Sequence, residues 1–367
     1  MKNTIALSIL VILITIVIVL VVININTDAN YIIENELEKE LVNSDDSNFY
    51  DLINSKNNIY FFETSYDDNY EITKKYINKY DLDGNQILRK DINSHNGFGN
   101  IASIFKSNSG IGEYHFIHKD IYNEDDYYME IQLYNSDLSQ INSFIPHEKI
   151  KEGIFGFDEN NTYLLTSERT IIKINGEEGK KIEIKFSDEI KNITSNFFAV
   201  LRYTFDNVGF TVCEKRQLYY ITYKVDYSGN ILWYHIEEDK PYIPCFCEND
   251  GDIIIKTISE DSYKYAFIDM NGNELWSSKK IVNSEFNPIS FGRIGDKYIV
   301  LDSASNGKLK ITLYGEKFNK QLATKIIDNL TAIDCLIDEN CRIYAIMKDA
   351  QSKQYYLNKY LITEIIK

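Results

Sequence analysis

Two stretches of the chain read Asp-Tyr-Ser-Gly-Asn-Ile-Leu-Trp (residues 226–233) and Asp-Met-Asn-Gly-Asn-Glu-Leu-Trp (residues 269–276). Such an Asp-x-x-Gly-Asn pattern is typical of a tight hairpin, because glycine reaches positive φ and the short polar side chains bond the turn amides. Apolar residues alternate with others before the turns, as Tyr263, Tyr265 and Phe267 do before the second one. This alternation predicts strands with one buried face, joined by hairpins.

The same strand–turn–strand pattern occurs at six places along the chain. Each turn is followed by an apolar residue that opens the next strand, and these residues are Ile87, Ile141, Ile182, Leu232, Leu275 and Leu322. Successive members lie 54, 41, 50, 43 and 47 residues apart, which is 47 on average. A repeat of about 40–50 residues that consists of strands is the signature of propeller blades.

A second set of hairpin turns lies between the first. Residues 245–254 align with residues 335–344, and residues 157–163 and 294–299 resemble them. Two hairpins in each repeat give four strands, which is one blade of a β-propeller. Residues 323–367 are long enough for one further blade. The sequence therefore predicts an all-β fold, a propeller of four-stranded blades; seven blades are preferred, and six or eight are possible.

The pattern Asp-x-x-Gly-Asn-x-Leu-Trp resembles the repeat of the quinoprotein-dehydrogenase-like (PQQ-like) β-propeller superfamily. The resemblance covers about residues 50–367 as architecture, and it implies a propeller. Superfamily enzymes that hold the quinone are longer chains, with a tryptophan docking motif in nearly every blade and adjacent cysteines over the quinone. This sequence has two tryptophans, Trp233 and Trp276, and no adjacent cysteine pair, so we predict no quinone and no other cofactor.

The N-terminal segment is predicted to anchor the chain in a membrane. Residues 5–23 are apolar except for Ser8 and Thr15, and as a helix they would rise about 28 Å, which matches a bilayer core. The run is longer than the apolar region of a signal peptide, and no small-residue cleavage motif follows it. Lys2 precedes the run and acidic residues follow it, which places the rest of the chain outside the cytoplasm.

The predicted domains are a signal-anchor transmembrane helix at residues 1–26, a polar stalk or linker at residues 27–47 and the propeller at residues 48–367. Within the stalk, Ile33, Leu37 and Leu41 lie four residues apart. That spacing predicts one apolar stripe on a short helix, either a solvated stalk or a weak self-association seam. A polar break at residues 44–47 marks the boundary of the propeller.

The composition excludes several classes of protein. The 367 residues include 44% hydrophobic and 13% aromatic residues, four Pro and five Cys, which argues against a disordered chain and a disulfide scaffold. With 39 Lys+Arg against 55 Asp+Glu, the formal net charge is −16. Phosphate backbones would repel such a chain, so we predict no nucleic-acid partner.

The cysteines suggest two sites, a metal pair and a disulfide, beside a purely structural role. Residues two apart on a strand share a face, so Cys245 and Cys247 could bind a metal, but no second ligand pair accompanies them. Cys245 and Cys335 occupy matching inner-strand positions, which favours buried structural thiols. Cys335 and Cys341 flank a hairpin turn and could form a disulfide outside the cell.

The remaining histidines and acidic residues also do not indicate a metal-binding or catalytic site. His115 and His118 lie three residues apart, which puts their rings on opposite faces of a strand. His235 follows a turn similar to those of propeller enzymes that transfer aryl sulfate with catalytic histidines, but a turn between outer strands lies far from the channel. Residues 81–85 imitate the start of a calcium loop without its later ligands, and the acidic residues 124–126 fit a solvated loop.

We assign no catalytic, cofactor-binding or metal-binding residues from the sequence. The favoured function is a membrane-tethered extracellular binding or scaffold module for a protein or a cell-envelope component, held in the membrane by residues 5–23. The alternative is a tethered extracytoplasmic enzyme that carries out sulfotransfer or hydrolysis on a small molecule. Propellers host many unrelated functions, so the predicted fold does not decide between the two.

Overall fold

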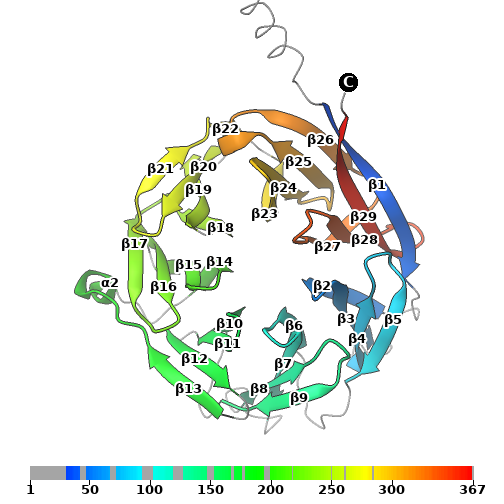
Figure 1. The fold of residues 1–367 in the computed structure, drawn as a ribbon, viewed down its shortest axis with the longest axis horizontal. Helices are drawn as coiled ribbons and strands as arrows, with labels where there is room; N and C mark the ends of the chain where they lie inside the picture. The colour runs from blue at the N-terminus through cyan, green and yellow to red at the C-terminus, as the bar shows by residue number, and fades with distance from the viewer. Residues whose placement is uncertain are drawn as a thin grey trace, which may run out of the picture.

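The protein is a ring of seven β-sheets (Figure 1). The computed structural model describes residues 30–41, 47–66, 72–92, 102–118, 127–146, 153–166, 169–175, 178–193, 199–216, 218–248, 250–259, 262–282 and 285–365. Each sheet has an uninterrupted four-strand order, and consecutive strands pair antiparallel. The preferred prediction of a seven-bladed, all-β propeller with four-stranded blades is confirmed.

The first three blades follow one another along the chain from the inside of the ring outwards. Blade 1 consists of β2 (Ser47–Ser55), β3 (Asn58–Tyr66), β4 (Ile72–Tyr80) and β5 (Gln86–Asp91); blade 2 of β6 (Ala102–Lys106), β7 (Ile111–His118), β8 (Tyr127–Tyr134) and β9 (Gln140–Phe144); and blade 3 of β10 (Gly153–Phe157), β11 (Thr162–Thr166), β12 (Thr170–Asn175) and β13 (Glu178–Glu183). The short helix α2 (Asp188–Asn192), capped by Ser187, follows blade 3.

The next three blades repeat this order. Blade 4 consists of β14 (Ala199–Phe205), β15 (Gly209–Arg216), β16 (Tyr219–Asp226) and β17 (Ile231–Glu237); blade 5 of β18 (Tyr242–Glu248), β19 (Gly251–Ser259), β20 (Ser262–Asp269) and β21 (Glu274–Ser277), with β22 (Ile281–Val282) beside β20; and blade 6 of β23 (Phe286–Ile294), β24 (Lys297–Ala304), β25 (Leu309–Tyr314) and β26 (Gln321–Ile327). A single 3-10 turn, η1 (Glu316–Phe318), precedes β26.

Blade 7 is built from both ends of the chain. Its three inner strands are β27 (Thr331–Ile337), β28 (Ile343–Lys348) and β29 (Tyr355–Ile365), and its outermost strand is β1 (Asn30–Leu41). Strand β1 pairs antiparallel with β29, from Asn30 opposite Ile365 to Leu41 opposite Tyr355. The ring is therefore closed by hydrogen bonds between the first and last described strands.

The prediction of a helical stalk at residues 27–47 is wrong for residues 30–41. A four-residue spacing suits a helix, but it is also a multiple of the two-residue period of a strand. Ile33 and Leu41 are 7% and 1% exposed, and they pack against blades 6 and 7. The open edge of β29 supplies the hydrogen-bond partners that make residues 30–41 a strand.

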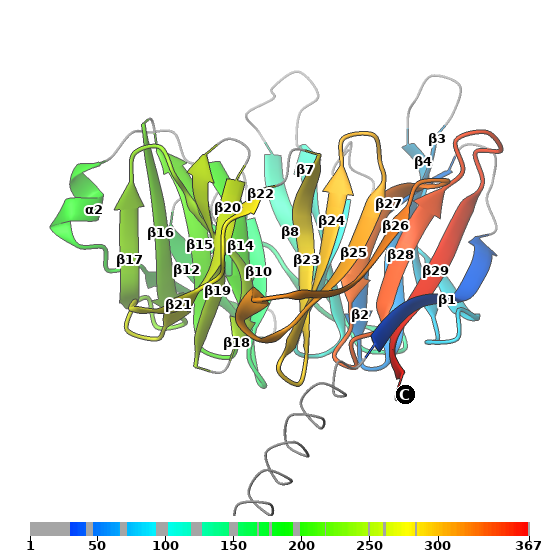
Figure 2. The ribbon, with the colours of Figure 1, turned by 90° about the horizontal axis from the view of Figure 1, so that it is seen from above.

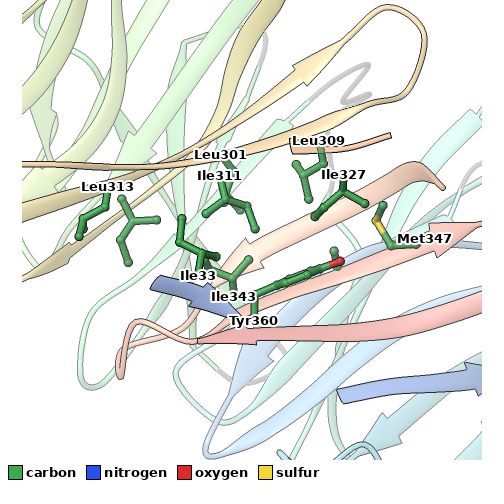
Figure 3. Packing of buried hydrophobic residues seen from close by; sticks show 11 residues of the cluster. Ile33, Leu301, Leu309, Ile311, Leu313, Ile327, Ile343, Met347 and Tyr360 are labelled. Carbon is green, nitrogen blue, oxygen red and sulfur yellow. The ribbon is translucent and has the colours of Figure 1, made fainter. Parts of the chain in front are cut away.

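The core consists of apolar layers between neighbouring blades. Figure 3 shows one layer, in which Ile33 of β1 and Tyr360 of β29 face Leu301, Leu309 and Ile311 of blade 6. Full burial of each such aliphatic side chain contributes about 1.5–3 kcal/mol relative to leaving it exposed. The sum of these layers, one for each blade contact, stabilises the ring.

Aromatic side chains fill the space between several blades. The rings of Phe105 and Phe155 stack at 3.7 Å between blades 2 and 3, and those of Tyr163 and Tyr227 stack at 3.8 Å between blades 3 and 4. These aromatic side chains therefore have a structural role in the contacts between blades.

The two faces of the ring carry different connections (Figure 2). Each blade has an inner hairpin turn between its first and second strands, and the structure describes an outer hairpin turn between the third and fourth strands of blades 1, 2, 4, 5 and 6. Because the strands alternate in direction, the inner and outer turns lie on one face, which we call the turn face. The turns between second and third strands, and the links between blades, lie on the opposite face.

The predicted anchor, residues 5–23, lies outside the described residues, as do His95, His147 and residues 124–126. Among the residues that the structure describes, no helix is long and apolar enough to span a bilayer.

Candidate functional site

A cavity of about 320 Å³ lies on the turn face near the centre of the ring, and we call it the mouth cavity. The inner turns of blades 7, 1 and 2 and the end of β10 line it, through residues Asn54, Ser55, Lys56, Asn57, Lys106, Ser107, Asn108, Phe157, Asp338, Glu339 and Asn340. These residues follow or end the innermost strands, so the cavity lies beside the central channel. Amides, hydroxyls, two ammonium groups and two carboxylates surround it, which suits a polar, hydrogen-bonding ligand.

Two polar contacts join different blades around the mouth cavity. Lys106 Nζ lies 3.1 Å from Glu339 Oε1, which joins blade 2 to blade 7, and 5.5 Å from the centre of the Phe157 ring. Lys56 Nζ donates to the Ser109 carbonyl oxygen at 2.6 Å, which joins blade 1 to blade 2. The ion pair is exposed, with Glu339 83% accessible, so it contributes little stability and is free to exchange its partner for a ligand.

Aspartate side chains cap several turns of the turn face. Asp226 Oδ1 accepts hydrogen bonds from the amides of Ser228 and Asn230, at 2.9 and 2.8 Å, and Oδ2 accepts one from Asn230 Nδ2. Gly229 has φ +83°, and a Cβ there would collide with the Glu183 carbonyl oxygen of blade 3. The expected need for Asp and Gly in this turn is thus confirmed, and close blade packing adds to the need for Gly.

The same capping geometry explains residues 81–85 without a calcium ion. Both carboxylate oxygens of Asp81 accept hydrogen bonds from within the turn, from the amides of Asp83 and Asn85 and from Asn85 Nδ2. The same set of bonds recurs at Asp269.

This turn chemistry makes the turn face acidic. Between the strands, the acidic residues of its described turns are Asp81, Asp83, Asp137, Asp158, Glu159, Asp206, Asp250, Asp296, Glu316, Asp338 and Glu339, and the basic ones are Lys56, Lys317, Lys320 and Arg342. Acidic side chains therefore outnumber basic ones in the described turns of this face.

The innermost strands contain β-bulges. Strand pairing shifts by one residue at Leu201 in β14, at Cys245 in β18, at Ile289 in β23 and at Ile333 in β27. Leu201, Ile289 and Ile333 are at least 40% exposed, although the strands themselves lie inside the ring. The bulges thus break the inward–outward alternation that sequence patterning assumes.

Two aspartates join neighbouring innermost strands. Asp334 Oδ2 accepts a 2.6 Å hydrogen bond from the Leu52 amide, which links blade 7 to blade 1, and Asp51 Oδ2 accepts a 3.2 Å bond from the Ile104 amide, which links blade 1 to blade 2. Asp51 has φ +57°, a strained conformation for this residue type.

Burial changes the titration of both carboxyls. Desolvation raises the pKa of Asp334 to about 6, and the nearby negative charge of Asp51 also raises it. The hydrogen bonds from the amides of Leu52 and Cys335 lower it in part. Desolvation also raises the pKa of Asp51. Both Asp334 oxygens accept backbone amides, so the carboxyl positions strands.

Cys245 and Cys247 do not share a face, contrary to the sequence expectation. The bulge at Cys245 turns its thiol towards the Ile253 carbonyl, inside the layer between blades 5 and 6. Cys247 Sγ instead lies 3.2 Å from Thr204 Oγ1 of blade 4 and 2.9 Å from Asp252 Oδ1. The position of Cys245 agrees with the prediction that it is a buried structural thiol.

Cys247 belongs to a buried ion-pair cluster. The side-chain ligand atoms of Asp206, Cys247 and Asp252 lie within 4.8 Å of one another, a spacing that could hold a metal. However, Lys224 Nζ donates to Asp206 at 2.7 Å and to Asp252 at 3.0 Å. Because an ammonium group already neutralises the carboxylates, the cluster fits an ion pair between blades 4 and 5 better than a metal site.

The other candidate cysteines and histidines are dispersed. Cys335 and Cys341 are free thiols, and Cys341 Sγ contacts the Arg293 carbonyl of blade 6. His115 and His118 lie on β7, with side chains outside the described set. His235 lies on β17, the outermost strand of blade 4, where burial lowers its pKa. The candidate residues whose side chains the structure describes are therefore not assembled into one site.

A second, more open cavity of about 440 Å³ lies on the outer side of blades 4 and 5. Lys185, Phe186, Leu232, Trp233 and Gly272 are among its lining residues. It is far from the channel, because β17 is the outermost strand of its blade.

The comparisons with known proteins show the fold. The sequence matches no protein-family model, and it matches no curated protein sequence. Among solved structures, YCF48 from Cyanidioschyzon merolae is 12% identical with a TM-score of 0.54, and the alignment covers 88% of this chain and 98% of that one. BBS1N, crystallised in complex with ARL6DN, is 11% identical with a TM-score of 0.51, covering 90% and 97% of the two chains. The likeness extends over nearly the whole ring, and membership of the PQQ-like superfamily stays a prediction.

Proposed function

We propose that the protein is a membrane-tethered, extracellular β-propeller with PQQ-like repeats, and that it binds or scaffolds a protein or a cell-envelope component. The mouth cavity is the proposed binding site. The observation that carries this proposal is the convergence of three inner turns from distant parts of the sequence on one polar cavity beside the channel. Binding residues commonly lie on loops that a rigid scaffold positions, and a propeller is such a scaffold.

Charge and fold support a protein or polymer partner. The acidic turn face disfavours nucleic acid, whose phosphates it would repel. The structure of BBS1N with ARL6DN is a protein complex of a chain with a similar fold. The apolar anchor predicted at residues 5–23 supports the location at the cell membrane.

Site-specific photo-crosslinking of the full-length chain on intact cells tests this proposal. A photoreactive residue at Asn57 or Asn108, both in the mouth cavity, is compared with one at Ser352, an exposed residue on the opposite face. We expect one reproducible crosslinked species from both cavity positions and none of that mass from Ser352. The same species from all three positions, or none from the cavity, would contradict the proposed site.

A further inference from the structure

The starting point of β1 determines which face of the propeller lies nearest the predicted anchor. β1 begins at Asn30, opposite Ile365, and ends at Leu41, opposite Tyr355. β29 is the third strand of its blade and runs from the opposite face to the turn face, where the C-terminal end lies in Figure 2. Asn30 is therefore at the edge of the turn face, the face that carries the mouth cavity.

The connection from the anchor to this point is short. Residues 24–29 separate the predicted anchor from β1, and a fully extended chain of this length spans about 20 Å. The start of β1 cannot swing away, because Ile33 is buried between blades 6 and 7, and Lys359 Nζ lies 2.6 Å from Glu36 Oε2. A tether of this length keeps the edge of the turn face close to the bilayer.

We propose that the turn face is the membrane-facing surface of the tethered propeller, and that its partner is a basic segment presented at the surface of the same membrane. This proposal rests on the proposed tethering and deepens the proposed binding function. A ligand that reaches the mouth cavity then enters through the narrow space between propeller and bilayer, which favours components already held at the membrane.

The acidic charge of the turn face favours a basic partner. Acidic side chains greatly outnumber basic ones in the described turns of this face, and the acids that do not cap turns, such as Asp83, Asp137, Glu159 and Asp250, are exposed. Anionic lipid headgroups are repelled by such a surface, whereas lysine and arginine side chains are attracted. At the centre of this field, the exposed Lys106–Glu339 pair can open so that Glu339 binds an incoming cation.

The first arm of the test measures orientation with the full-length chain in phosphatidylcholine vesicles. A donor fluorophore is attached at Ser228→Cys on the turn face or at Ser352→Cys on the opposite face, each with Cys341→Ser to remove a partly exposed thiol. The faces are about 25 Å apart, the length of an eight-residue strand such as β15. We expect clearly higher energy transfer to a headgroup-labelled lipid from position 228; equal transfer, or higher transfer from 352, overturns the proposed orientation.

The second arm measures the charge preference. The probe is a palmitoylated Lys-rich peptide in the same vesicles, with a palmitoylated Glu-rich peptide as the comparison. Neutralising four exposed acids of the turn face (Asp83→Asn, Asp137→Asn, Glu159→Gln and Asp250→Asn) should weaken binding of the Lys-rich peptide at least about fivefold. The matched control neutralises four exposed acids of the opposite face (Glu238→Gln, Asp239→Asn, Glu285→Gln and Asp328→Asn) and should change binding less than about twofold.

The outcomes separate this proposal from the binding function itself. Equal weakening by both quadruple variants, or equal binding of the two peptides, overturns the basic-segment partner. Either failure leaves the photo-crosslinks from the mouth cavity unaffected, whereas loss of those crosslinks would reject the proposed site even with the orientation confirmed.

Discussion

A single aspartate holds each outer hairpin turn in blades 1, 4 and 5. In blade 4, Asp226 accepts two turn amides and the side-chain amide of Asn230. These bonds satisfy donors that the turn would otherwise leave without protein partners. The sequence predicted this chemistry correctly, because it depends on residues within one turn.

We expect Asp226→Ala to lower the free energy of unfolding by about 1–2 kcal/mol, the usual cost of losing such a cap. Ser228→Ala is the matched control, because Ser228 is exposed and offers its amide, which the substitution keeps. Urea denaturation followed by tryptophan fluorescence measures both. Equal effects of the two substitutions would show that the capping carboxylate contributes nothing.

Asp334 gives a test of pH dependence at the inner strands. Its pKa is raised to about 6 in the folded protein, mainly by desolvation, against about 3.9 in an unfolded chain. The folded state thus binds the proton more tightly, so this group's contribution to stability is full below about pH 4 and is lost as the pH rises through about 6.

Asp334→Asn removes this titration and keeps one oxygen as an acceptor for the Leu52 amide. The wild type should therefore gain stability relative to the variant as the pH falls from 7 to 4, by about 2 kcal/mol. Parallel urea denaturations at both pH values measure the difference, in which other titrating groups cancel. A difference that does not change with pH would contradict the buried, amide-bound carboxyl.

At the scale of the element, β1 shows where sequence patterning failed and why. Ile33, Leu37 and Leu41 fit a helical stripe and a strand face equally well, and only the open edge of β29, more than 300 residues away, decides between them. The β-bulge at Cys245 is a similar case, because one extra residue sends Cys245 and Cys247 towards different blades. The strand repeat and its hairpin turns, which depend on local patterns, were predictable, and the preferred number of seven blades was correct.

Strand β1 should lose stability when its buried side chains are shortened. Leu41 is 1% exposed and packs with Phe49 and Tyr355, so Leu41→Ala should cost about 2–4 kcal/mol of unfolding free energy. Glu40→Ala, next to it on the exposed side, should change stability by less than about 0.5 kcal/mol. Thermal or urea denaturation checks both, and a tolerated Leu41→Ala would contradict the role of β1 in the core.

At the scale of the molecule, ring closure couples the ends of the chain. A fragment of residues 30–367 keeps all seven blades complete, whereas a fragment of residues 45–367 lacks β1 and leaves the edge of β29 unpaired. Open edges favour aggregation. We expect the first fragment to be monomeric with one cooperative unfolding transition, and the second to aggregate or to unfold at a markedly lower temperature, as size-exclusion chromatography and calorimetry would show.

The mouth cavity is a property of the whole ring. Its lining comes from residues 54–57, 106–108, 157 and 338–340, which no local motif connects. The sequence could not reveal it, because it exists only when blades 7, 1 and 2 are adjacent. The same closure brings the start of β1 to the turn face, and so links the cavity to the proposed membrane tether.

One labelling experiment tests directly whether the ring lies outside the cytoplasm, as proposed. The full-length chain carrying Ser352→Cys and Cys341→Ser is treated with a membrane-impermeant maleimide on intact cells and, in parallel, after lysis. A propeller tethered outside the membrane gives equal labelling in both samples, all of it in the membrane fraction. Labelling that occurs only after lysis would contradict the account.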